Sequence, residues 1–355
     1  MPAATGISVS PDGRFVVASR NGYALVEPRT GALLALHDTG AILGQPVLRM
    51  VAGKELLQVG ASGFDSVMTL DPRTLVDSGD LAIRLRPGPV DQLVTRPAQE
   101  ALIALHQDGA HPAELRRVVG GGETPDAFVF APGDFIESCR LSPDGGTLLA
   151  RYRPVAQAPE GPMSVLLLDA HAPWAGVAPT VLTVPGGVVA DAADGNRLVL
   201  VGPAGARVVD LAAALRGETK LAGAGDIAFA APLDAIYSEA GVIEGRLVAL
   251  TTTGPSTVRP QVFDLETGAS VLGPPTTLPY RRFYFTLAPG GRRIVCLSDD
   301  SGVEQVLSFP FEFVTATLGT QDAPVNVPNA TLMYVYPEGD RIAVVTADGH
   351  AHLVE

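Results

Sequence analysis

The sequence predicts an all-β protein assembled from one repeated unit, because a hairpin phrase recurs at regular spacing in a chain of suitable composition. Ser10-Pro11-Asp12-Gly13 precedes an apolar run at 14–18, and Ser142-Pro143-Asp144-Gly145 precedes another at 147–150. Hydrophobic residues make up 46% of the 355 residues, with 39 glycines and 30 prolines, which suits many strands joined by many turns. A helix is expected only around residues 211–215.

The unit repeats every 40 to 50 residues, measured between the residues that begin the strand after each turn, such as Arg14, Lys54 and Glu100. A fixed period of this length is typical of a repeat architecture. The strands are continuous apolar runs, as expected of strands covered on both faces. They are predicted at 15–19, 55–59, 101–105, 147–151, 197–201, 247–251, 293–297 and 342–346.

A third strand follows in most repeats and ends in an acidic residue. Val262-Phe263-Asp264-Leu265-Glu266-Thr267-Gly268 is the fullest copy, and Leu25-Val26-Glu27-Pro28-Arg29-Thr30-Gly31 is a second one. The acid can accept backbone N–H bonds within its own turn, and glycine permits the positive φ that a tight reversal needs. The repeat is therefore predicted to be four antiparallel strands joined by hairpins.

A four-stranded unit with this period predicts a β-propeller, in which each twisted sheet packs against its neighbours around a channel. The markers favour eight blades; seven result if the weak repeat around residues 90–119 is not a blade of its own. One domain, residues 1–355, is expected, with repeats near 1–40, 41–86, 87–133, 134–185, 186–231, 232–279, 280–322 and 323–355. The last repeat shows three strands, so residues 1–6 would have to supply a fourth.

The Ser-Pro-Asp-Gly hairpins and the acid-x-x-Thr-Gly turns resemble those of bacterial YVTN-type and WD-repeat propellers over essentially the whole chain. The arrangement typical of WD repeats, with a Gly-His pair before the blade and a Trp-Asp pair ending its third strand, is absent: Trp174 is the only tryptophan, and it lies in the connection after Asp169. The hydrogen-bonded tetrad of that family is therefore not carried over. The resemblance implies an architecture more than an activity.

Charge and cysteine content exclude several classes of function. The net charge of -13 and the pI near 4.9 oppose nucleic-acid binding, which draws on a basic surface. No apolar stretch is long enough to span a membrane, so no membrane partner is expected. Cys139 and Cys296 are expected to be buried thiols in different blades rather than a disulfide, and a cytoplasmic location is predicted.

No catalytic, cofactor or metal site is predicted. His350 and His352 share one face of a predicted strand, but no third ligand accompanies them in the sequence. The chain has no Gly-x-Ser-x-Gly elbow, and Gly120-Gly121-Gly122 is not followed by a helix that could bind phosphate.

Loop length indicates where a partner would bind. With strands lettered A to D from the channel outward, the B–C and D–A connections share one face, and the long ones are expected at 153–162, 252–260, 273–281 and 320–330. Functional residues concentrate in loops carried on a rigid scaffold. The candidate partner-binding residues on this face are Asp134, Arg153, Arg259, Tyr280, Arg281 and Arg282.

The leading hypothesis is a non-catalytic scaffold or sensor module that binds a protein or peptide partner on the B–C and D–A face, with Arg and Tyr as anchors. The alternative is a hydrolase resembling YVTN-type lactonases, with its site at the mouth of the channel. The hairpins favour this alternative, whereas the His-rich and acidic motifs expected near the mouth are not recognisable.

Overall fold

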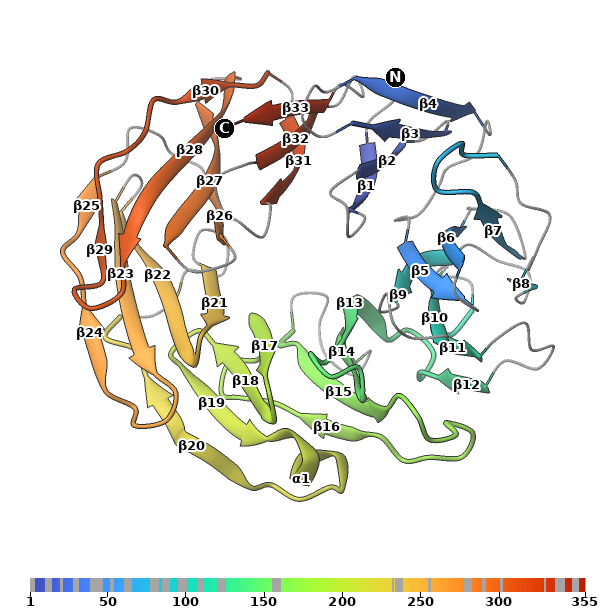
Figure 1. Ribbon diagram of the computed structural model, residues 1–355. Helices are drawn as coiled ribbons and strands as arrows, with labels where there is room; N and C mark the ends of the chain where they lie inside the picture. The colour runs from blue at the N-terminus through green and yellow to red at the C-terminus, as the bar shows by residue number, and fades with distance from the viewer. Residues whose placement is uncertain are drawn as a thin grey trace. The chain divides into compact units, whose positions relative to one another are not determined.

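The structure is a computed structural model that confirms the predicted strands (Figure 1). It describes residues 4–9, 15–19, 22–27, 32–38, 47–51, 54–60, 66–76, 83–84, 90–94, 101–107, 111–119, 126–154, 161–231, 233, 239–254, 257–277, 283–288, 292–300, 303–328, 330–335, 342–346 and 351–354. Every apolar run predicted to follow a turn is a strand, and the expected helix is α1 (Leu211–Leu215).

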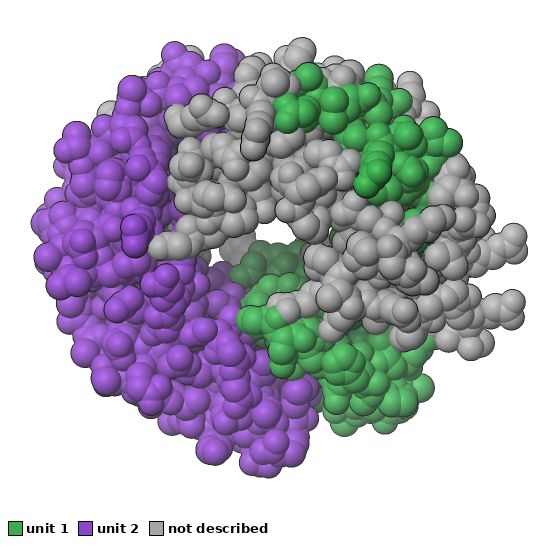
Figure 2. Space-filling model, viewed as in Figure 1, with its two compact units in different colours: residues 1–160, 168–179, 344–353 green, residues 161–167, 180–343, 354–355 purple. Residues whose placement is uncertain are grey.

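The chain divides into two compact units (Figure 2): residues 1–160, 168–179 and 344–353 form unit 1, and 161–167, 180–343 and 354–355 form unit 2. In unit 1, three sheets have the orders β1–β2–β3–β4, β5–β6–β7–β8 and β9–β10–β11–β12. Their strands are β1 (Ala4–Val9), β2 (Phe15–Ser19), β3 (Gly22–Val26), β4 (Leu33–Asp38), β5 (Val47–Val51), β6 (Lys54–Gly60), β7 (Ser66–Leu70), β8 (Ile83–Arg84), β9 (Val90–Val94), β10 (Ala101–His106), β11 (Glu114–Val119) and β12 (Asp126–Val129).

The fourth sheet has the order β13–β14–β15–β16, built from β13 (Phe135–Leu141), β14 (Thr147–Arg153), β15 (Ser164–Asp169) and β16 (Thr180–Leu182). Unit 2 holds β17 (Ala190–Asp194), β18 (Arg197–Gly202), β19 (Gly205–Asp210) and β20 (Leu221–Ala228) as one sheet. The next joins β21 (Glu239–Ile243), β22 (Arg246–Gly254) and β23 (Thr257–Asp264) to β24 (Ser270–Leu272) and β25 (Thr276–Thr277).

The sheet after it joins β26 (Phe283–Leu287), β27 (Arg293–Asp300) and β28 (Val303–Glu312) to β29 (Thr317–Leu318) and β30 (Val325–Asn326). The last described strands are β31 (Ala330–Val335), β32 (Ile342–Thr346) and β33 (Ala351–Val354), which pair in that order. Neighbouring strands run antiparallel wherever the structure gives their register, as predicted.

The recurring phrase serves to close each repeat. In the Ser142 hairpin, the Ser142 hydroxyl donates to Asp144 Oδ1 at 2.5 Å and accepts the Thr147 N–H at 2.9 Å, while Gly145 takes a φ of 76°. A backbone bond then ties each A–B turn to the residue after the third strand. It runs from Ala170 N to Gly146 O, from Leu211 N to Asn196 O and from Leu265 N to Gly245 O. In the longer strand β28, the corresponding bond runs from Phe311 N, within the strand, to Arg292 O. These bonds satisfy backbone groups that every turn would otherwise leave unpaired.

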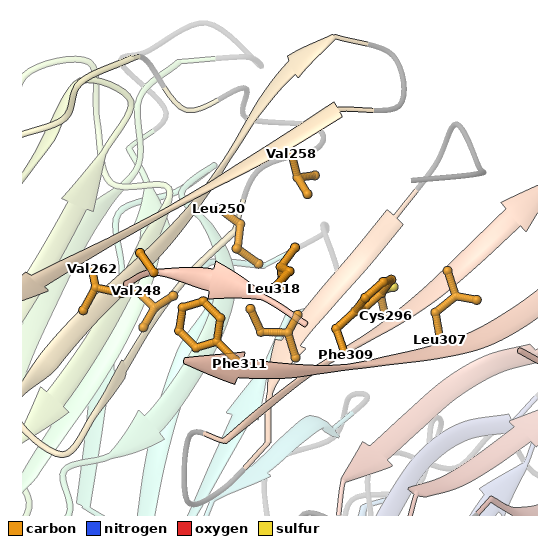
Figure 3. Close-up of a cluster of buried hydrophobic side chains, with 11 residues drawn as sticks. Val248, Leu250, Val258, Val262, Cys296, Leu307, Phe309, Phe311 and Leu318 are labelled. Carbon is orange, nitrogen blue, oxygen red and sulfur yellow. The ribbon is translucent and has the colours of Figure 1, made fainter. Parts of the chain in front are cut away.

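Consecutive sheets pack through their first strands and through apolar faces. In unit 2, β17 lies beside β21 and β21 beside β26; in unit 1, β1 lies beside β5 and β9 beside β13. One buried cluster joins Val248, Val262, Leu307, Phe309 and Phe311 across two sheets (Figure 3). Continuous apolar strands arise because both faces of each middle strand are covered in this way.

The prediction of long connections is wrong in part for three segments, because they contain strand residues. Strands β22 and β23 extend through most of 252–260, because threonine-rich segments suit extended backbone. The 273–281 and 320–330 segments contain β25 and β30, which pair with β23 and β28 beside the short fourth strands. The residues predicted to complete the last blade lie partly in β1, which pairs with β2 in the first sheet instead.

Both cysteines are buried and neither forms a disulfide, as predicted, and burial raises the pKa of Cys139 to about 12. The described chain contains no helix that is long and apolar enough to cross a membrane.

Candidate functional site

The structure brings two of the predicted partner-binding residues together at one end of the β13–β14 hairpin. Phe135 opens β13 and is the register partner of Arg153, which ends β14; Asp134 directly precedes Phe135. This end lies opposite the A–B turn at Ser142, so it is where the D–A connection arrives and the B–C connection leaves. We call Asp134, Phe135 and Arg153 the Phe135 site.

The Phe135 site presents an aromatic ring with a cation over it. The Arg153 guanidinium lies 5.4 Å from the centroid of the Phe135 ring, within the range of a cation–π interaction. Phe135 is nevertheless 46% exposed. Arg153 Nε is buried and has no hydrogen-bond partner among the described residues.

The backbone beneath the ring is fixed by a glutamine from the preceding sheet. Gln107 Nε2 donates to Ile136 O at 3.2 Å, and Gln107 Oε1 accepts the Ile136 N–H at 2.7 Å. This pair of bonds imitates a strand partner for the residue that follows Phe135. The site therefore begins on a braced backbone rather than on a free loop.

Aromatic packing supports the same hairpin from its buried side. The Tyr152 and Phe130 rings lie 5.6 Å apart, and Phe130 packs edge-on against Phe128 at 5.1 Å. Burial, and after it the negative charge of Asp134, raises the pKa of Tyr152. The phenol is therefore neutral at physiological pH and serves as packing beneath the exposed ring.

The prediction that Arg259 lies on a loop is wrong. The residue lies in β23, opposite Thr251, and its Nε donates to Gly273 O at 3.0 Å, where the outer strand breaks between β24 and β25. That hydrogen bond ties the Arg259 side chain to the backbone between β24 and β25 of its own sheet. Tyr280, Arg281 and Arg282 lie outside the described residues.

Trp174 and its charged neighbours form a buried network after β15. Trp174 is 1% exposed; its Nε1 donates to Asp169 O at 2.7 Å, and Arg117 stacks over its ring at 5.4 Å. Asp126 accepts from Trp174 N at 2.6 Å and from Arg117 Nη2 at 3.0 Å. These bonds join β11, β12 and the segment after β15, so the network holds the fold, although Arg117 Nε is buried without a hydrogen-bond partner among the described residues.

No group of three or more His, Cys, Asp or Glu side chains in the described ranges is arranged to hold a metal ion. Phe135 itself was missed by the sequence interpretation, which looked for charged loop residues. The available signal was an aromatic residue at the first position of a strand, immediately after Pro132-Gly133-Asp134.

Comparison with known proteins establishes the fold. The sequence matches no protein-family model and no curated protein. Its structure is similar to the Dos1 propeller, with a TM-score of 0.61 and 12% identity over 99% of this chain and 91% of that one. It is also similar to the WD40 domain of SCAP from fission yeast, with a TM-score of 0.53 and 10% identity over 99% of this chain and 94% of that one.

A third neighbour is the dihydro-heme d1 dehydrogenase NirN, with a TM-score of 0.56 and 19% identity over 92% of this chain and 67% of that one. The chain thus has an all-β propeller fold, as the sequence predicted. Because the neighbours include both a WD40 domain and a dehydrogenase, the fold alone does not assign an activity.

Proposed function

We propose that this protein is a non-catalytic propeller that binds a protein or peptide partner on the face carrying the B–C and D–A connections. The observation that carries the proposal is the exposed Phe135 ring with Arg153 stacked on it, on a backbone braced by Gln107. Aromatic residues and arginines dominate the binding energy of protein interfaces, and prior rigidity lowers the entropy lost on binding. The Phe135 site supplies an exposed aromatic ring with an arginine and a backbone that is already held in place.

We also propose eight blades in a single domain of residues 1–355. The support is that the strands between Val90 and Val129 form a sheet of their own, and that the last described sheet contains three strands. Class averages from electron microscopy, viewed along the channel, would count the blades directly.

A displayed peptide library selected on the purified protein tests the binding proposal. We expect selected peptides to lose affinity for Phe135→Ala, because truncating an aromatic anchor removes most of its buried apolar contact. Arg153→Ala should weaken binding as well, whereas Arg153→Lys should restore only part, since lysine stacks less well on a ring.

The matched control is Val177→Ala, which truncates an exposed apolar residue in the C–D connection, at the opposite end of a sheet. This variant should bind as the unmodified protein does. Equal affinity of the Phe135→Ala and Val177→Ala variants for every selected peptide would refute the Phe135 site.

A further inference from the structure

Unit 2 contains a cavity of about 300 Å³ on the sheet β17–β20, and none of its lining residues belongs to the Phe135 site. Its lining comes from the end of β20, the beginning of β19 and the connection between β16 and β17. The lining residues are Val184, Pro185, Ala204, Gly205, Ala206, Arg207, Asp226, Ile227 and Ala228. We call this the β20 pocket.

Small residues open the β20 pocket. Gly205 pairs with Ala228, and Arg207 pairs with Asp226, so these four side-chain positions project from one face of the sheet. A Cβ on Gly205 would lie 2.3 Å from Ile227 O, which leaves glycine as the residue that fits there. Gly205 thus lets the backbones of β19 and β20 approach closely, and no side chain larger than a methyl group projects from Gly205 or Ala228.

The wall of the β20 pocket is tightly packed. A Cβ on Gly202 would lie 2.8 Å from Val184 Cγ2, and one on Gly187 would lie 2.3 Å from Pro162 Cβ. Gly187 also has a φ of 85°, and its N–H donates to Val184 O at 2.9 Å. The Val184–Pro185 wall thus has little room to collapse into the cavity, so the pocket is preformed.

The polar edge of the β20 pocket offers both a donor and an acceptor. Arg207 Nε donates to Asp226 Oδ1 at 2.7 Å, and Arg207 Nη2 lies 3.4 Å from Asp226 Oδ2. This fork uses only part of the donors of the guanidinium and of the lone pairs of the carboxylate. A peptide group, with one N–H and one C=O, complements such an edge.

We propose that the β20 pocket receives a single large aliphatic side chain from an extended, basic peptide segment of a partner protein. The cavity is at the small end of the range of about 300–1,000 Å³ for ligand pockets, so it has room for one large aliphatic side chain together with the peptide backbone that carries it. The Asp226 side chain is 61% exposed against 33% for Arg207, and the chain carries a net charge of -13, so both favour flanking lysine or arginine. This inference rests on the proposed peptide-binding function and names the partner chemistry.

The probes are short fluorescein-labelled peptides with the core Gly-Lys-X-Lys-Gly, in which X is Leu, Ala or Asp, and a second set with Glu in place of Lys. Fluorescence anisotropy should show saturable binding of the Leu peptide and roughly tenfold weaker binding of the Ala peptide, because one buried aliphatic side chain is lost. Exchanging Lys for Glu should weaken binding further.

Two variants locate the contact. Ala228→Leu places a larger side chain in the cavity and should remove the preference for Leu over Ala. Asp226→Asn should weaken binding of the Lys peptides and strengthen binding of the Glu set, because it removes a negative charge and leaves Arg207 without its counter-ion. The matched control is Ala212→Leu, at an exposed position of α1, which should bind all peptides normally. Circular dichroism spectra should show that the variants are folded.

Equal affinities for Leu and Ala peptides, or unchanged binding by Ala228→Leu, would overturn the proposal. Concentration-dependent self-association that Ala228→Leu abolishes would assign the pocket to a second copy instead, and would also overturn it. Running Phe135→Ala in parallel separates the two proposals: loss of selected peptides there, with no effect of Ala228→Leu, keeps the Phe135 site and rejects the β20 pocket.

Discussion

At the scale of single residues, acidic side chains set the turns that end the third strands. Asp264 Oδ1 accepts the N–H groups of Glu266 and Thr267 and the Thr267 hydroxyl, at 3.0, 2.8 and 2.9 Å. Asp71 accepts two N–H groups in the same way. The bond from Thr267 N is the main cause that lowers the pKa of Asp264, and that from Arg73 N lowers the pKa of Asp71.

The first prediction concerns the pH dependence of these turns. A carboxyl whose pKa is lowered by folding stabilises the fold fully above its unfolded value of about 3.9, and this contribution is lost as the pH falls through the lowered folded value. Asp264→Ala should therefore lower the Tm at pH 7, and the difference from the unmodified protein should shrink towards pH 3. Calorimetry at several pH values measures it.

The control for this prediction is Asp264→Asn, which retains an acceptor oxygen and removes the charge. Its Tm difference from Asp264→Ala should be the same at every pH. A Tm deficit of Asp264→Ala that is as large at pH 3 as at pH 7 would contradict the assignment.

The second prediction concerns Leu75, which occupies the place that Gly268 has in the Asp264 turn. Both residues have a positive φ, 56° and 73°, and both donate their N–H to the main-chain carbonyl oxygen of the aspartate that opens the turn. Yet Leu75 is only 1% exposed. Leu75→Ala should cost about 2–5 kcal/mol of unfolding free energy through the lost packing. Leu75→Gly should cost about 1 kcal/mol less than that, because glycine adopts this φ without strain.

Urea unfolding of the two variants tests this order, which reverses the usual one for alanine and glycine. A lower midpoint for Leu75→Gly than for Leu75→Ala would show that the positive φ is not a source of strain.

At the scale of elements, long arginines link one repeat to the C–D turn of the next. Arg117 of β11 reaches Ala170 O and the Trp174 ring, Arg197 of β18 reaches Glu266, and Arg246 of β22 lies 5.4 Å from the Phe313 ring. Each contact joins two consecutive repeats. The turn after the third strand is therefore held both by the acidic residue within it and by an arginine from the preceding sheet.

The third prediction compares the stability contributed by the buried Asp126 network with that of the exposed ion pair between Arg207 and Asp226. Asp126 is contacted by Arg117 Nη2, Trp174 N and Ala175 N, and its side chain is 20% exposed. Asp126→Ala should lower the unfolding free energy by about 2–4 kcal/mol, since it leaves buried donors unpaired. The control Asp226→Ala breaks the exposed pair with Arg207 and should cost about 0–1 kcal/mol.

Urea titrations give both values. Equal losses for the two variants would mean that the Trp174 network contributes no more than a surface ion pair.

At the scale of the whole molecule, the structural features that the sequence predicted are those that are local and repeated along the chain. Turn chemistry at Ser142 and Asp264 and the apolar runs predicted strands and hairpins, because each depends on neighbours within a few residues. It did not predict the Arg117–Trp174 contact or the pairing of Phe135 with Arg153, since these depend on residues far apart in the chain. Arg259 was misplaced because a Thr-Gly-Pro-Ser segment was interpreted as a loop, although β-branched threonines extended the strands into it.

The last prediction uses the net charge of the molecule to separate two parts of peptide binding. A charge of -13 attracts the Lys-flanked Leu peptide over a distance set by salt, about 10 Å at 0.1 M and about 3 Å at 1 M. Affinity should therefore fall several-fold between low and high NaCl, mainly through a slower association rate.

Burial of the aliphatic side chain in the β20 pocket is not screened by salt. The ratio of affinities for the Leu and Ala peptides should accordingly stay constant across the same titration, while both absolute affinities fall. If the ratio instead falls with the affinities, salt-dependent contacts contribute to the discrimination, and the apolar residues Val184, Pro185 and Ala228 do not by themselves form the contact that distinguishes the two peptides.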